Sequence, residues 1–391
     1  MKQTVFGLGI LAALALVSYR AAVACPFCSA PSLTLSEQVQ QSDAVALVSW
    51  TEGVMPKDQD PGSTVYEVVQ IVKSPKGTME KGTKITLVRY RAGKPGDLFM
   101  LLGTKGMKEN TLDWGSPTEV TDTSFQYIAQ APSPEAPPQK RLAYFMKFLE
   151  FPDPLVTNDA YGEFANAPYK EIAPLAPTFP REKLREWVTS KETSPTRLGL
   201  YGLMLGLCGT QEDAELMEKK IAEPSQEFRL GIDGVMSGYL LLTGDKGLDK
   251  IDTLKLADKK VPFSETYAAM QALRFMWTYA EGKIPKERLM QSMRILLDRP
   301  ELADLVIADL ARWGDWSLQD RLMELYDSKD YTIPSIKRAI VRYMLQSTKF
   351  ESKDPKAEPP AHVAVGKKHL DALRAKDPKT VKEAERFFFL N

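Results

Sequence analysis

Histidine and cysteine are scarce in this chain of 391 residues, and each scarcity narrows the chemistry that the chain can perform. The two histidines, His362 and His369, both lie near the C-terminal end of the sequence. Because histidine supplies most general acid–base catalysis and many metal sites, this scarcity argues against a catalytic triad and a conventional metal centre. We also find no P-loop, GxSxG or HExxH motif. The sequence therefore indicates no catalytic residue, metal or cofactor, and whether the protein has any enzymatic activity stays open.

An excess of charge of either sign is also missing. Lysine plus arginine and aspartate plus glutamate each number 51, so the formal net charge is zero. This balance removes the usual electrostatic basis for binding nucleic acid or an anionic membrane surface. Beyond the first residues, no apolar run reaches the length of about 18 residues that would span a bilayer. We therefore expect protein partners rather than nucleic acid.

The N-terminus has the pattern of an export signal. Lys2 is followed by an apolar run over 5–17, and Ala22–Ala24 gives small residues at the positions of a cleavage site. The pattern predicts a signal peptide at 1–24 and an extracytoplasmic protein, whether periplasmic, in the cell envelope or secreted. Membrane attachment is expected only if Cys25 carries a lipid or the signal stays uncleaved.

Cys25 and Cys28 stand directly after the predicted cleavage site, in a CPFC motif. Four interpretations are open: a local disulfide, a thiol redox pair, a metal site and a lipid anchor on Cys25. Disulfides persist outside the cytoplasm, which favours the first. A redox pair usually follows a strand, and none can precede Cys25 once the signal peptide is removed. A zinc site needs about four ligands, more than the two cysteines of this motif supply. Ala22 replaces the leucine usual in a lipidation signal. The third cysteine, Cys208, lies in an apolar segment and is expected to be a buried small side chain.

Residues 25–131 have the composition of a small antiparallel barrel or sandwich. Runs of Val, Ile, Thr and aromatic residues alternate with breaks that contain Gly and Pro. This pattern predicts five strands, over 43–50, 63–74, 83–90, 97–103 and 123–131. The segments "SDAVALVSW", "IVKSPKG" and "GDLFMLL", together with Cys25, resemble the netrin-like module, an OB-type barrel. That resemblance covers about a quarter of the chain and implies a barrel of the kind found in tissue inhibitors of metalloproteinases and in complement proteins.

After a proline-rich linker at 132–139, the apolar period changes from two to about 3.6, which predicts helices over 140–348. Two decapeptides, "RLGLYGLMLG" from Arg197 and "RLGIDGVMSG" from Arg229, repeat each other. Each interior glycine costs about 1 kcal/mol in a helix, so we expect close helix packing to offset this cost. The residues concerned are Gly199, Gly202, Gly206, Gly231, Gly234 and Gly238.

The helical region resembles HEAT and armadillo repeats, in which stacked helix pairs share one continuous core. Several predicted helices begin at or near a proline, a residue suited to the first turn. These are Pro180, Pro195, Pro224, Pro285, Pro300, Pro334 and Pro378. We expect a mobile loop at 349–368 and capping helices at 369–391, in which three phenylalanines near the C-terminus dock onto the array.

The predicted fold is therefore a multidomain chain, a small β-barrel or sandwich followed by an all-α HEAT-like solenoid. Segments such as "DAYGEFANAPY" and "DLVIADLARWGDW" resemble uncharacterised exported bacterial proteins that join such a barrel to such repeats. Trp313 and Trp316 are candidates for partner contact or for packing between repeats. The sequence favours a non-enzymatic interaction scaffold; the alternatives are a thiol redox protein using Cys25 and Cys28, and a lipid-anchored envelope component.

Overall fold

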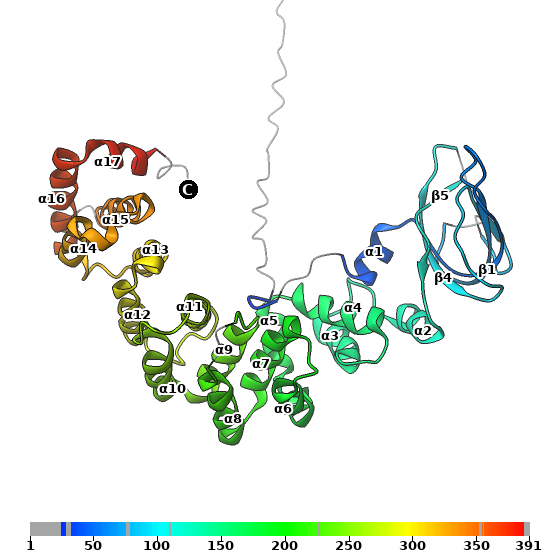
Figure 1. Ribbon diagram of the computed structural model, residues 1–391, viewed down its shortest axis with the longest axis horizontal. Helices are drawn as coiled ribbons and strands as arrows, with labels where there is room; N and C mark the ends of the chain where they lie inside the picture. Colours follow the sequence, from blue (N-terminus) through cyan, green and yellow to red (C-terminus); the bar gives the residue numbers. More distant parts are fainter. Residues whose placement is uncertain are drawn as a thin grey trace, which may run out of the picture.

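The computed structural model describes residues 25–28, 33–75, 79–108, 111–224, 227–351, 354 and 356–386. An antiparallel sheet in the N-terminal part is followed by a long series of helices that curve around a hollow (Figure 1). The predicted division into a β part and a helical part is confirmed at this level. The signal peptide predicted at 1–24 and the three C-terminal phenylalanines lie outside the described residues.

Six strands form the sheet within the described residues, in the order β3-β2-β1-β4-β5, with β6 paired to β4. Every pairing is antiparallel. Four of the five predicted strands are confirmed, and two short ones, β5 and β6, were not anticipated. The bounds are β1 Ala44–Val54, β2 Ser63–Lys73, β3 Lys84–Leu87, β4 Leu98–Lys105, β5 Leu112–Trp114 and β6 Thr118–Glu119.

Both faces of the central strands are buried, but in different cores. Ala46 and Val48 of β1 point into a small core of the sheet, together with Phe99 and Leu101 of β4. The residues that alternate with them, such as Leu47, belong to the large core of the helical part. This explains why β1 opens with an unbroken apolar run, as strands that are buried on both faces do.

The two edges of the sheet are linked by a side chain instead of a strand pairing. Arg89, which follows β3, donates from its guanidinium to the carbonyl oxygens of Trp114 (3.2 Å) and Gly115 at the end of β5. Because β3 and β5 are the outer strands of the sheet, this contact brings its opposite edges together. The sheet is thus curled onto its own small core.

The strand predicted at 123–131 is wrong: this segment is the helix α2, Asp122–Gln130. The Thr121 hydroxyl accepts a hydrogen bond from the amide of Ser124, and the Thr121 amide donates one to the Ser124 hydroxyl, which is a capping arrangement that starts a helix. Its buried residues Phe125 and Ile128 lie three positions apart, on one helix face. A further helix, α1 Leu35–Gln41, begins at a capping box formed by Thr34 and Glu37 and was not anticipated.

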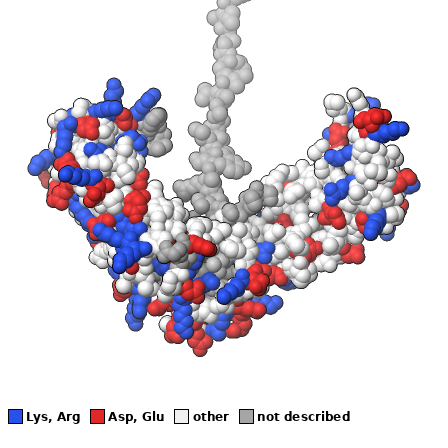
Figure 2. Space-filling model, in the orientation of Figure 1, with Lys and Arg blue, Asp and Glu red and all other residues white. Residues whose placement is uncertain are grey.

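The remaining helices follow one another along the arc, with α8 and α10 on its outer side and α11, α13 and α15 nearer the hollow (Figure 1). Basic and acidic side chains are intermixed over the face of the molecule that Figure 2 shows. The bounds are α3 Pro138–Phe145, α4 Pro154–Ala165, α5 Tyr169–Ile172, α6 Arg181–Thr189, α7 Pro195–Cys208, α8 Gln211–Ala222, α9 Ile232–Thr243, α10 Asp245–Ile251, α11 Phe263–Tyr279, α12 Lys286–Ile295, α13 Ala303–Trp313, α14 Gln319–Asp327, α15 Pro334–Ser347, α16 Ala361–Lys376 and α17 Pro378–Glu385.

Proline marks the start of several of these helices, as predicted, with one exception. Pro195, Pro334 and Pro378 occupy the first helical turn. Pro224 lies in the segment between α8 and α9 and starts no helix. The N-cap of α9 is Gly231 instead, at φ 80°, a conformation that favours glycine. The other three are Pro180 and Pro285 at N-caps and Pro300 in a 3₁₀ turn.

Two connecting segments differ from the prediction. The linker at 132–139 is not an extended spacer, because it forms a turn closed by the Ala136 amide on the Ser133 carbonyl, and α3 already begins at Pro138. The loop predicted at 349–368 ends earlier, because α16 begins at Ala361. Val363, Gly366, Leu370 and Leu373 are buried at helical spacing, and this packing against α14 and α15 holds the segment in a helix.

Ion pairs connect consecutive parts of the helical region. Arg181 and Arg185 of α6 both reach Asp213 of α8 at 2.7 Å. Further along, Arg274 of α11 reaches Asp309 of α13 at 2.6 Å. Each of these carboxylates is buried, so the arginines supply the charge and hydrogen bonds that burial requires. The same arrangement recurs in Arg229–Glu265 and Arg294–Asp315, and Arg288 pairs in a similar way with the half-buried Asp252.

Candidate functional site

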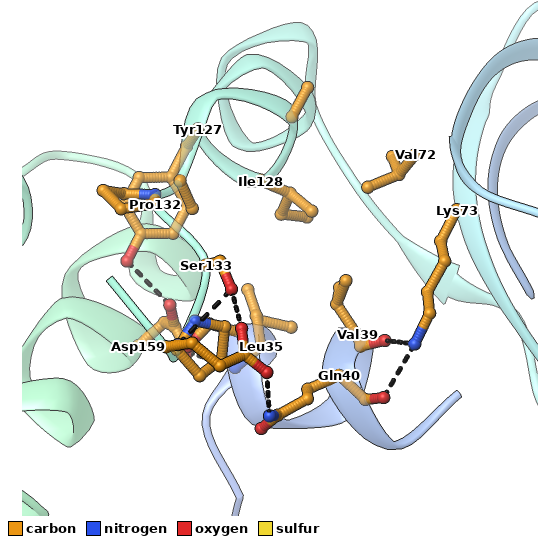
Figure 3. A pocket seen from close by; sticks show the side chains of 15 residues that line it. Leu35, Val39, Gln40, Val72, Lys73, Tyr127, Ile128, Pro132, Ser133 and Asp159 are labelled. Carbon is orange, nitrogen blue, oxygen red and sulfur yellow. Dashed lines mark hydrogen bonds between the residues drawn. The ribbon is translucent and has the colours of Figure 1, made fainter. Parts of the chain in front are cut away.

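A pocket lies where the sheet meets the helices, and we call it the junction pocket (Figure 3). Its volume is about 390 Å³, and its walls come from α1, β2, α2, the turn before α3 and one residue of α4. The side chains around it are mostly apolar, with a few polar groups among them. The lining residues are Leu35, Ser36, Val39, Gln40, Val72, Lys73, Tyr127, Ile128, Ala129, Ala131, Pro132, Ser133, Pro134, Glu135 and Asp159.

Two buried carboxylates of α4 hold the first turn of α1. The amide of Leu35 donates to Asp159 Oδ1 at 2.6 Å, and the Ser36 hydroxyl donates to Glu163. The carboxylates lie four residues apart, one helical turn, so both face the same way. The start of a helix has unpaired amides and a partial positive charge, which favours acidic partners. These contacts therefore fix α1 to α4 although the two helices are far apart in sequence.

Asp159 is the most unusual ionisable group of this pocket. Its second oxygen accepts a hydrogen bond from the Tyr127 hydroxyl of α2 at 2.7 Å, and its residue is only 8% exposed. Burial raises its pKa from 3.8 to about 6, against the opposing effect of the two hydrogen bonds. Burial, with the nearby charge of Asp159, also raises the pKa of Tyr127. The carboxyl group of Asp159 therefore titrates in the mildly acidic range.

Glu163 has a charged partner that Asp159 does not share. Arg141 of α3 lies 3.8 Å from Glu163 and 3.7 Å from Glu171. Among the ion pairs of the described residues, none includes Asp159. An ionised Asp159 would thus be buried without a counter-ion, which is costly, whereas Glu163 is compensated.

The opposite rim of the junction pocket closes on the end of α1. The Lys73 ammonium of β2 donates to the carbonyl oxygens of Val39 (3.3 Å) and Gln40 (2.8 Å). A cation at these last carbonyls complements the negative end of a helix. Both ends of α1 are therefore tied to other elements, and the polar groups of the pocket already have protein partners. This arrangement can couple the protonation of Asp159 to the position of α1.

Cys25 and Cys28 form a disulfide, and the short loop that they close lies on the helical part. Cys25 is 3% exposed, and its amide donates to the carbonyl of Ala165 at 3.1 Å. Between the cysteines, Phe27 packs its ring 5.0 Å from that of Phe275 in α11. The N-terminal peptide that we had assigned to the β part thus contacts helices instead, because its aromatic side chain finds apolar partners there.

The third cysteine is poorly suited to chemistry. Cys208, at the end of α7, is half-buried, and burial raises the pKa of its thiol to about 11. Since the thiolate is the reactive form, this thiol is a weak nucleophile at neutral pH.

The glycines of the two decapeptides meet each other across α7 and α9. A Cβ added to Gly202 would stand 2.6 Å from the Cα of Val235, and one added to Gly199 would stand 3.3 Å from the Cα of Gly231. Gly206 meets Gly238 and Gly234 meets Gly199 in the same way. Any side chain at these positions would push the two backbones apart. The stripe is therefore a packing surface within the fold.

The two tryptophan candidates are placed within the protein. Trp313, 8% exposed, stacks on Trp277 of α11 with ring centroids 4.3 Å apart and an angle of 7°. Trp313 therefore packs between helices, the second of its two interpretations, because its ring joins α11 to α13. Trp316 is partly buried and lies edge-on to Tyr343, with His362 stacked beside it. The second histidine, His369, bonds Asp320 at 2.8 Å.

A second hollow, which we call the α13–α15 groove, runs between these two helices. Its volume is about 680 Å³. Small residues and long basic side chains together make up much of its lining. The lining residues are Asp304, Leu305, Ala308, Ala311, Arg312, Ser335, Arg338, Ala339, Arg342, Tyr343, Gln346 and Lys349.

Sequence reasoning did not identify Asp159, Glu163 or the arginines of the groove. The one usable signal for the carboxylates was their spacing of four along one helix, since acids on a buried face need partners. The groove had no such signal, because exposed arginines occur throughout the helical region.

No protein-family model, no curated protein and no solved structure matches this chain. Among the described residues, no group of three or more His, Cys, Asp or Glu side chains is placed to hold a metal ion. No helix in the described part of the chain combines the length and apolarity needed to cross a bilayer.

Proposed function

We propose that this protein is a non-enzymatic, exported interaction scaffold whose helices form a HEAT-like solenoid. The observation that carries the proposal is the α13–α15 groove, a hollow of about 680 Å³ between two neighbouring inner helices. In stacked helical repeats, inner helices line an extended surface that contacts partners. The ion pairs that connect α6 to α8 and α11 to α13 support a continuous array, because each one joins consecutive repeats.

The sheet fits this proposal as a second module. Its curled shape, with Arg89 bridging the outer strands, supports a small barrel of the netrin-like type. One face of the sheet shares a hydrophobic core with the helices. We therefore propose that the sheet and the helical part present one continuous binding surface.

The disulfide favours the scaffold over both alternatives. Cys25 is almost fully buried and carries a packed loop, whereas redox pairs need an accessible sulfur. Its sulfur is bonded to Cys28 and is not available for a lipid thioether. A disulfide of this kind also fits an extracytoplasmic compartment.

Site-specific photo-crosslinking tests this function in cells that express the whole chain. A photoreactive amino acid at exposed Ala308, in the groove, should give discrete crosslinked protein species. The matched position is Glu215, exposed on the outer helix α8, where we expect no such species. Equal crosslinking at both positions, or none at either, would contradict the proposal. Mass analysis of the mature protein then shows whether it starts at Cys25 and carries a lipid.

A further inference from the structure

We infer that the α13–α15 groove binds an acidic, extended segment of a partner protein. This inference rests on the proposed function and adds the chemistry of the partner. Four of the lining side chains are basic and one is acidic. The basic residues are Arg312 of α13, Arg338 and Arg342 of α15, and Lys349 just beyond it, and the acidic residue is Asp304. The chain as a whole is neutral, so this local excess of positive charge is a property of the groove.

The positive charge of the groove is only partly compensated by the protein itself. Arg312 is 69% exposed and shares the buried carboxylate of Asp309 with Arg274, so two guanidinium groups face one carboxylate. Arg338 contacts Glu383 at 3.4 Å. The exposed Arg342 donates to the main-chain carbonyl of Ala384, and it forms no ion pair with any of the described residues. An anionic ligand would therefore meet guanidinium groups with unused donors.

The spacing of the arginines suits an extended chain. Arg338 and Arg342 are one helical turn apart, about 6 Å along α15. Side chains on one face of an extended peptide recur about every 7 Å, so carboxylates at alternate positions can reach successive arginines. Several lining side chains are small, Ala308 and Ala339 among them, which leaves room for a backbone. Carboxylate recognition by arginine is favoured because its planar donors match both oxygens.

Part of the lining of the α13–α15 groove is apolar. Leu305 of α13 is 37% exposed at one end of the groove. An acidic segment that also carries an aliphatic side chain could bury that side chain here, and steering by the surrounding charges would speed its association. We therefore expect acidic residues interspersed with aliphatic ones, and not a purely acidic run.

Fluorescence anisotropy with the whole mature chain tests this inference. The probe is a labelled peptide of about ten residues that alternates Glu and Leu, which spans about 33 Å when extended. The comparison peptide has Lys in place of every Glu. We expect saturable binding of the Glu peptide that weakens with salt, and binding of the Lys peptide at least about tenfold weaker.

Groove variants assign the binding to this surface. Arg338→Gln with Arg342→Gln should weaken binding of the Glu peptide at least about tenfold, because two charge-assisted contacts are lost. Ala308→Phe, at an exposed lining position, places a bulky ring in the groove and should weaken binding while every charge is kept. The control is Arg321→Gln, which removes an exposed arginine of α14 paired with Asp298 and should leave the affinity unchanged.

Several results would overturn the inference. One is equal affinity for the two peptides, and another is an affinity for the Glu peptide that the groove variants do not change. A third is groove-dependent binding of a single-stranded oligonucleotide with an affinity equal to that of the Glu peptide. A fourth is binding of the Glu peptide only to a variant truncated after Arg386, because the groove would then be occupied by the C-terminal residues of the same chain. If the peptide fails while crosslinking at Ala308 still captures a discrete partner, the acidic-segment inference falls and the scaffold function stands.

Discussion

Gly202 of α7 and Val235 of α9 lie so close that a Cβ added to Gly202 would stand 2.6 Å from the Cα of Val235. Real Cβ atoms do not approach a backbone atom this closely, so the two helices could not keep their separation with alanine at position 202. The close packing of the two backbones thus offsets the unfavourable helix propensity of the glycines. The repeated decapeptides owe their glycines to this single contact surface.

Gly202→Ala should therefore destabilise the protein although alanine is the better helix former. We expect a net loss of about 3 kcal/mol in the free energy of unfolding, since overpacking must move a whole helix. Urea unfolding followed by circular dichroism measures it. The matched control is Gly162→Ala in α4, where the new Cβ meets only the methyl group of Thr34 at 3.3 Å. That change should stay within about 1 kcal/mol, and equal losses in both variants would refute the packing argument.

The stacked pair Trp277 and Trp313 joins α11 to α13, assisted by the ion pair between Arg274 and Asp309. Trp313→Ala should lower the free energy of unfolding by about 3–5 kcal/mol, because it removes a large buried ring. Trp277→Phe keeps most of the volume and should cost less than about 1.5 kcal/mol.

The two tryptophan variants can be separated spectroscopically. Closely stacked indoles give an exciton-coupled circular dichroism signal, and either change should abolish it. Loss of this signal in Trp277→Phe with near-native stability is the expected combination. A Trp313→Ala variant as stable as the unmodified chain would show that the two helices are held together elsewhere.

Thiol counting separates the disulfide from a reduced cysteine pair. The chain has three cysteines, of which Cys208 is half-buried with a thiol pKa raised to about 11. In the folded, unreduced protein we expect a maleimide reagent to react slowly with at most one thiol. After denaturation one thiol should react, and after denaturation with reductant all three should. Rapid labelling of two thiols in the folded protein purified without reductant would favour the redox alternative.

Removal of the disulfide tests what the loop contributes. Cys25→Ser with Cys28→Ser should cost about 2 kcal/mol of stability, because a loop this short restricts the unfolded chain only modestly. Phe27→Ala keeps the disulfide but removes the ring that packs on Phe275. If Phe27→Ala costs nothing while the double serine variant does, the loop acts through its covalent bond alone.

Local alternation and the glycine repeat were the parts of the fold that the sequence predicted well. β1, β2 and β3 follow from segments rich in β-branched residues, which favour strands, and β4 follows from a short apolar run between glycine-containing breaks. The segment 123–131 misled us because Phe125, Tyr127 and Ala129 alternate as in a strand. The capping residues Thr121 and Ser124 outweigh this pattern, and they were visible in the sequence.

The junction pocket could not have been predicted in the same way. Asp159 takes its hydrogen bonds from Leu35, 124 residues away, and from Tyr127, 32 residues away. A single sequence contains no information on such distant pairs. A carboxylate in an apolar helix indicates a need for partners, but only the fold supplies their identity.

The final prediction concerns pH and uses the buried carboxyl of Asp159. Its pKa in the folded protein, about 6, lies above the ordinary value of 3.8, so folding favours the protonated form. The stabilisation from this group is complete below pH about 4 and is lost as the pH rises through about 6. The difference of about two pKa units corresponds to about 3 kcal/mol.

The variant Asp159→Asn tests this pH dependence. Its side chain cannot ionise and still offers an acceptor to the Leu35 amide, so the change should remove the pH dependence and raise stability above pH about 7. Hydrogen exchange at α1 should report the same change locally, since the Leu35 amide donates directly to Asp159. Asp122→Asn, at an exposed position of α2, should leave the pH dependence unchanged. If the protection of α1 against exchange in the wild-type protein is constant between pH about 4 and 8, burial does not raise the pKa of Asp159.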